Sequence, residues 1–94
     1  MSKFWAVIPA GGRGLRFGSQ VPKQYITVAG MAVLDHVLQA FLKFHAFETI
    51  VVPVPSEDSR FHDLTASADD RIVAIVGGQE RADSVRAGLE WIVA

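Results

Sequence analysis

Three short, largely apolar runs divide the sequence. They occupy residues 4–8, 49–54 and 72–76. Runs that are apolar at nearly every position are typical of parallel strands buried on both faces. Proline has no amide hydrogen for the ladder, so we expect the second strand to end at Pro53 and Pro55 or to fray at its C-terminal tip.

Apolar residues at helical spacing lie between these runs. One stripe predicts a helix over residues 33–44 and consists of Leu34, Val37, Leu38, Phe41 and Leu42. A second stripe predicts a helix at the end of the chain and consists of Val85, Leu89, Ile92 and Val93. Gly88 falls on that second stripe, where the lack of a side chain would let the helix approach the sheet closely.

Two weaker elements complete the pattern. Residues 25–28 predict a short strand before a turn at Ala29-Gly30, and residues 56–64 predict a short polar helical segment. The alternation of strands and helices is typical of a parallel sheet covered by helices on both faces, joined by right-handed crossovers. Three short strands make a thin core, so we expect only part of a larger fold.

Composition limits the class of protein. The 94 residues are 50% hydrophobic and carry a formal net charge of -1, which suits one small globular domain. The absence of cysteine excludes disulfides, thiolate metal sites and a cysteine nucleophile, and it is typical of a cytoplasmic protein. No apolar run is long enough to cross a bilayer, so neither a membrane-spanning segment nor export is expected.

Positive charge is concentrated near the N-terminus. Before the first acidic residue, Asp35, the sequence has four cations, Lys3, Arg13, Arg16 and Lys23. Such a local excess favours a discrete anionic ligand over the broad basic face of a nucleic-acid binder.

A glycine-rich loop follows the first predicted strand. It contains Gly11, Gly12, Gly14 and Gly18, and glycines allow a sharp turn that presents backbone N–H groups to an anion. A Walker A motif is excluded because the chain has no Gly-Lys pair, and the dinucleotide fingerprint is weak because Phe17 stands where its third glycine belongs. The nucleotidyltransferase pattern Ala-Gly-Gly-x-Gly-x-Arg, followed by Pro22-Lys23, fits throughout. The alternative is a structural turn with solvated cations.

Other conspicuous residues favour structural roles. The three histidines, His36, His45 and His62, lack metal-ligand spacing and an evident partner, so no zinc site is expected. Asp69-Asp70 is typical of a solvated turn. We expect Trp5 and Trp91 to be core aromatic residues. No G-x-S-x-G elbow is present, so a serine hydrolase is not expected.

Four segments together resemble a known family. They are Pro-Ala-Gly-Gly-x-Gly-x-Arg-Phe from Pro9, Pro-Lys-Gln-Tyr from Pro22, Asp-Ser-Arg-Phe from Asp58 and Gly-Gly-Gln-Glu-Arg-Ala-Asp-Ser-Val from Gly77. In this order they look like the 2-C-methyl-D-erythritol 4-phosphate cytidylyltransferases of isoprenoid biosynthesis. The resemblance spans residues 1–94 and covers only the N-terminal part of the family's domain. It implies a three-layer α/β/α Rossmann-like nucleotidyltransferase fold with a mostly parallel sheet.

The resemblance also implies a reaction and a set of site residues. CTP and a sugar-alcohol phosphate would give a CDP-alcohol and pyrophosphate, with Mg²⁺ on the triphosphate. Arg16 and Lys23 would be the catalytic cations. The remaining residues would bind the nucleotide: Ala10, Gly11, Gly12 and Gly14 along the triphosphate and ribose, Gly78, Gln79 and Ser84 at the cytosine, and Arg81 as support for the second loop.

Parts of the family's machinery are expected beyond residue 94. These are the His-Asp-Ala-Ala-Arg-Pro segment, whose Asp binds the metal, and the arm that forms a homodimer. Among the 94 residues we find no clear Mg²⁺ ligand. Two alternatives stay open, namely a ribitol-5-phosphate cytidylyltransferase and a nucleotide-binding fragment without catalysis of its own. A dehydrogenase would leave Arg16 and Lys23 without a purpose.

Overall fold

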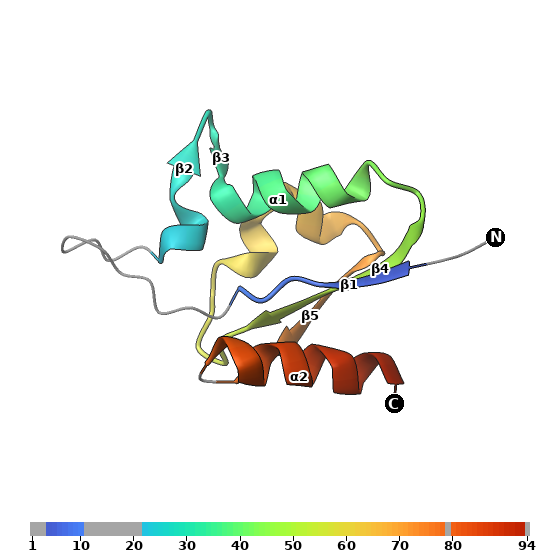
Figure 1. Ribbon diagram of the computed structural model, residues 1–94. Helices are drawn as coiled ribbons and strands as arrows, with labels where there is room; N and C mark the ends of the chain where they lie inside the picture. Colours follow the sequence, from blue (N-terminus) through green and yellow to red (C-terminus); the bar gives the residue numbers. More distant parts are fainter. Residues whose placement is uncertain (1–3, 11–21, 79, 94) are drawn as a thin grey trace.

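The three apolar runs form one parallel sheet. The computed structural model describes residues 4–10, 22–78 and 80–93. Its main sheet has the order β1-β4-β5, with bounds β1 (Phe4–Val7), β4 (Phe47–Val54) and β5 (Ile72–Val76). Both pairings are parallel, and Val51 of β4 lies opposite Val7 on one side and Val73 on the other. The carboxyl ends of the three strands therefore share one edge of the sheet (Figure 1).

The central strand β4 is the most deeply buried element of the described chain. Ile50, Val51 and Val52 are fully buried. β4 ends at Val54, directly before Pro55, so the predicted end of this strand is confirmed, and Pro53 stays paired within it. Pairing survives without a proline amide, since the Pro53 carbonyl still accepts a hydrogen bond from the amide of Ala10 at 2.8 Å.

The predicted first helix is α1 (Val33–Leu42), which lies on one face of the sheet (Figure 1). It buries Leu34 and Leu38 from the expected stripe. The helix ends at Leu42, shortly before the predicted boundary, and the Arg71 guanidinium binds the backbone there. Arg71 donates to the carbonyls of Leu42 at 2.6 Å, Phe44 at 3.1 Å and Phe47 at 3.2 Å. One side chain thus joins the end of α1 to the start of β4.

The last helix, α2 (Arg81–Val93), covers the opposite face (Figure 1). The predicted apolar stripe was wrong as a buried face, because Leu89 is 53% and Val93 82% exposed. The buried positions are Ser84 and Gly88. The close approach at Gly88 is confirmed, since a Cβ there would lie 2.5 Å from Val7 Cγ1. The small residues Ser84 and Gly88, one turn apart, therefore form the buried side of α2, whereas Leu89 and Val93 are exposed.

Neither tryptophan is a core residue. Trp5 is 52% and Trp91 45% exposed, which corrects both the core assignment and the expectation that the first strand is buried on both faces. Within the described residues β1 pairs only with β4, so one of its edges is uncovered. The Trp5 indole N–H donates to Glu48 Oε2 at 3.1 Å on the neighbouring strand.

Short 3₁₀ helices replace the predicted helical segment over residues 56–64. They are η2 (Phe61–Asp63) and η3 (Thr65–Ala68). The carboxylate of Asp35, in the first turn of α1 and only 3% exposed, accepts hydrogen bonds from the amides of Thr65 at 2.8 Å and Ala66 at 3.0 Å. A buried carboxylate is well satisfied by backbone donors, and here it fixes η3 to α1.

A small hairpin precedes α1. It follows η1 (Lys23–Tyr25) and consists of β2 (Thr27–Val28) and β3 (Met31–Ala32), which pair antiparallel. Gly30 has a φ of 83°, a conformation that favours glycine, at the predicted turn. His36 does have a partner, contrary to expectation, because its Nε2 lies 2.6 Å from the Val28 carbonyl oxygen. Because residues 23–25 form η1, the predicted strand over residues 25–28 is shorter and begins at Thr27.

In the described ranges, no helix has the length and apolarity to span a membrane.

Candidate functional site

Two predicted ligand-binding loops meet at the end of β4. The carbonyl of Pro53 accepts a hydrogen bond from the amide of Ala10 at 2.8 Å, where the glycine-rich loop begins. The next carbonyl, that of Val54, accepts one from the amide of Gly77 at 2.8 Å, where the second loop begins. Consecutive residues of one buried strand therefore anchor both loops at the sheet edge where open α/β folds bind ligands.

Several predicted site residues lie outside the described ranges. They are Gly11, Gly12, Gly14, Arg16 and Gln79. Their roles stay predictions, as does the route of the glycine-rich loop. Ala10 is described and buried, and its backbone is bonded on both sides, so the start of the loop is fixed.

The predicted catalytic cation Lys23 begins the 3₁₀ helix η1 and is exposed. Its backbone is held by the turn itself, because the amide of Ile26 donates to the Lys23 carbonyl at 3.2 Å. The neighbouring Gln24 donates through Nε2 to the Ala10 carbonyl at 2.7 Å. This contact holds the backbone beside Lys23 at the point where the glycine-rich loop leaves β1.

Tyr25, two residues after Lys23, ties the same short helix to a second part of the chain. Its ring is buried, and its hydroxyl donates to Asp58 Oδ2 at 2.5 Å. The second oxygen of Asp58 accepts hydrogen bonds from the amides of Arg60 and Phe61, each at 2.9 Å. Burial, and then the hydrogen bond to the Asp58 carboxylate, raise the pKa of the Tyr25 phenol above its ordinary value. The phenol therefore stays protonated and serves as a donor.

The second loop packs tightly on the start of α2. A Cβ on Gly77 would lie 2.6 Å from Ser84 Oγ, and one on Gly78 would overlap Asp83 Cβ, so both positions require glycine. Ser84 is 2% exposed, and its hydroxyl donates to the Gly78 carbonyl at 3.5 Å. The structure thus gives Ser84 a role in holding this loop, while its contact with a base stays a prediction. Arg81, the first residue of α2, is exposed.

Comparison with known proteins agrees with this arrangement. Residues 4–94 match the model of the IspD family, 2-C-methyl-D-erythritol 4-phosphate cytidylyltransferase. The chain belongs to this family. A family member from Serratia proteamaculans is 41% identical over 85 residues, which are 90% of this chain and 36% of that protein. One from Pseudomonas putida KT2440 is 45% identical over 82 residues, or 87% of this chain and 35% of that protein.

A solved structure shares the fold as well. The crystal structure of 4-diphosphocytidyl-2C-methyl-D-erythritol synthase is 33% identical, with a TM-score of 0.78 over 98% of this chain and 39% of that one. The predicted α/β Rossmann-like architecture is therefore confirmed, in part, by a member of the cytidylyltransferase family. This chain spans little more than a third of the length of the relatives it matches.

The acidic and histidine side chains of the described residues do not gather into a metal site. In the part of the chain that the structure describes, no group of three or more His, Asp or Glu residues could hold a metal ion. The described residues therefore do not by themselves fit a Mg²⁺ site of the kind the cytidylyltransferase family implies, and we derive no chemical step through the metal.

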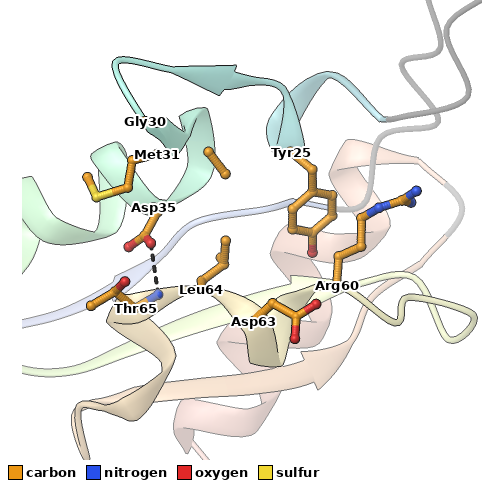
Figure 2. Close-up of a pocket in the computed structure, with 9 residues that line it drawn as sticks. Tyr25, Gly30, Met31, Asp35, Arg60, Asp63, Leu64 and Thr65 are labelled. Atoms are coloured by element: carbon orange, nitrogen blue, oxygen red, sulfur yellow. Dashed lines mark hydrogen bonds between the residues drawn. The ribbon is translucent and has the colours of Figure 1, made fainter.

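A pocket of about 300 Å³ lies between the hairpin and residues 60–65. Figure 2 shows Asp35 and Tyr25 on one side of it, facing Arg60, Asp63 and Thr65 on the other. Asp35 is hydrogen-bonded to backbone amides and Tyr25 to Asp58. None of the predicted site residues that the structure describes lines this pocket, although Tyr25, two residues after Lys23, does.

Sequence reasoning missed the residues that hold the site together. Gln24, Tyr25 and Asp58 belong to the family motifs, but among these neighbours the motifs predict a role only for Lys23. Their hydrogen bonds join positions 14 and 33 residues apart. The signal was present, because polar residues within two short motifs need partners when the fold buries them.

Proposed function

We propose that the protein carrying this chain transfers a cytidylyl group from CTP to 2-C-methyl-D-erythritol 4-phosphate, giving the CDP-alcohol and pyrophosphate. Membership of the cytidylyltransferase family supports this reaction. The structural observation that carries it is the anchoring of both nucleotide loops on neighbouring carbonyls, those of Pro53 and Val54. A ligand that touches both loops can be held at its phosphates by one and at its base by the other.

The chemistry requires cations close to the α-phosphorus of CTP. The acceptor phosphate attacks this atom in line while pyrophosphate leaves, so negative charge must be compensated and the reactants aligned. We assign that compensation to Arg16 and Lys23. The backbone of Ala10, Gly11, Gly12 and Gly14 would follow the triphosphate and ribose, as glycine-rich turns do for phosphates.

The second loop would recognise the base. Backbone groups of Gly78 and Gln79 and the hydroxyl of Ser84 are assigned to the cytosine. Fixed donors and acceptors discriminate between bases because a wrong base leaves buried polar groups unpaired. The packing of Gly77 and Gly78 against α2 supplies the necessary rigidity, and Arg81 would support the loop from the start of that helix.

The proposal includes Mg²⁺ bound to the triphosphate, where it would neutralise part of the phosphate charge. Its expected protein ligand is the Asp of the family segment beyond residue 94. We further propose a cytoplasmic homodimer that binds neither nucleic acid nor membrane. Light scattering of the full-length protein gives the mass of the assembly directly.

One assay tests the reaction. The purified full-length protein, given CTP, Mg²⁺ and 2-C-methyl-D-erythritol 4-phosphate, should release pyrophosphate, and omission of the acceptor or replacement of CTP by ATP should abolish release. Turnover with ribitol 5-phosphate but not with 2-C-methyl-D-erythritol 4-phosphate would instead identify a ribitol-5-phosphate cytidylyltransferase. Binding of CTP by calorimetry without turnover of either acceptor would leave a nucleotide-binding protein without catalysis of its own.

A further inference from the structure

The contact between Gln24 and Ala10 links two segments that sequence motifs treat separately. Gln24 Nε2 donates to the Ala10 carbonyl at 2.7 Å, across 14 residues of chain. The amide of Ala10 donates in turn to Pro53 of the central strand at 2.8 Å. The Gln24 side chain is therefore connected, through one residue, to the most buried strand of the sheet.

Lys23 directly precedes two such anchors, Gln24 and Tyr25. The turn that contains Lys23 is closed by the Tyr25 amide, which donates to the Pro22 carbonyl at 2.9 Å. The Tyr25 hydroxyl fixes η1 to Asp58, whereas Gln24 fixes it to the sheet edge from which both nucleotide loops extend. An exposed lysine has a flexible side chain, so the position of its backbone sets the region that its ammonium group can reach.

We propose that Gln24 is a positioning residue that holds Lys23 at the sheet edge by donating its amide hydrogen to Ala10. This inference rests on the proposed function, because it assigns Gln24 a part in the reaction through Lys23. Small displacements of a group that stabilises charge in a transition state lower the rate without removing the group, and a shift near 1 Å can cost about 100-fold. Gln24 thus contributes to kcat through the placement of Lys23.

The test uses Gln24→Met in the full-length protein, which keeps the length of the side chain and removes the donor. Gln39→Met is the matched control, because Gln39 makes its own hydrogen bond to Asp35 at 3.3 Å on α1, away from the strand ends. We expect Gln24→Met to lower kcat by about 10-fold to 100-fold with the KM for the acceptor nearly unchanged. The control should stay within about twofold of wild type.

A double variant separates positioning from a general structural effect. If Gln24 acts through Lys23, the Lys23→Ala, Gln24→Met protein should be no slower than Lys23→Ala alone. Rate losses that multiply, or an unchanged kcat in Gln24→Met, would overturn the proposal.

A second readout does not depend on turnover. Gln24→Met should lower the ¹⁵N order parameter of the Lys23 amide, and Gln39→Met should not. An unchanged order parameter overturns the positioning role even in a protein that proves to have no transferase activity. A wild-type protein that fails to turn over CTP would instead refute the proposed function, so the two failures are distinguishable.

Discussion

The hydroxyl of Tyr25 donates a 2.5 Å hydrogen bond to Asp58, a residue 33 positions further along the chain. Asp58 also accepts two backbone hydrogen bonds from the start of η2. The pair thereby ties the segment that carries Lys23 to the connection between β4 and β5. Two motifs that look independent in the sequence form one structural unit.

Removing this hydrogen bond should destabilise the protein. Tyr25→Phe deletes only the hydroxyl, and hydrogen bonds to charged groups contribute about 1.5–3 kcal/mol, so we expect a loss of that size in the free energy of unfolding. Urea denaturation measures it. Asp58→Asn removes the charge and leaves one acceptor oxygen for three donors, so it should cost at least as much. The combined variant should lose less than the sum of the two single losses, and full additivity would show that the pair does not interact.

Stability should decline at alkaline pH because of the same phenol. Its pKa is raised in the folded protein, mainly by burial, while an unfolded tyrosine titrates near its ordinary value of about 10. Above that pH the unfolded chain has released the proton and the folded chain still binds it, so the free energy of unfolding falls as pH increases. Denaturation at a series of pH values should show this fall in wild type and a smaller one in Tyr25→Phe. Equal slopes would contradict the raised pKa.

Lys23 should affect catalysis much more than folding. Lys23→Ala removes a cation that we place beside the reacting phosphorus, and loss of one charge-stabilising group lowers kcat by roughly 100-fold or more. Arg16→Ala should behave in the same way. Lys43→Ala removes a cation that is also exposed but lies at the end of α1, and it should leave turnover unchanged. Normal turnover in Lys23→Ala would remove this residue from the mechanism.

Gly88 should tolerate no side chain. In Gly88→Ala the new methyl group would lie 2.5 Å from Val7 Cγ1, and such overpacking costs about 1–3 kcal/mol. This exceeds the gain of about 1 kcal/mol that alanine gives over glycine within a helix. The urea midpoint should therefore fall, and adding Val7→Ala should restore part of it. A midpoint that rises in Gly88→Ala would show that α2 can move away from β1.

The sequence was most informative where local chemistry decides the structure. The runs at β1, β4 and β5 form strands close to the predicted bounds, and the α1 stripe buries Leu34 and Leu38. The close approach at Gly88 was also predictable, because only a missing side chain allows it. These features depend on residue type and spacing alone.

The predictions were wrong where contacts between distant parts of the chain determine which side chains are buried. Burial of Trp5 depends on what covers the outer edge of β1, and burial along α2 depends on which side of that helix meets Val7. For the candidate site, the motifs identified the residues proposed to bind the nucleotide. The hydrogen bonds of Gln24 and Tyr25 depend on the tertiary structure and cannot be predicted from the hydrophobic periodicity.

Arg71 lies at the end of the sheet opposite to the two loops. Its guanidinium joins three carbonyls at the close of α1 and the beginning of β4, whereas both loops emerge where β4 finishes. The hydrogen bonds of Arg71 and the two loops are thus separated by the length of β4. Substitutions in the two loops therefore leave the hydrogen bonds of Arg71, which brace α1 against β4, unchanged.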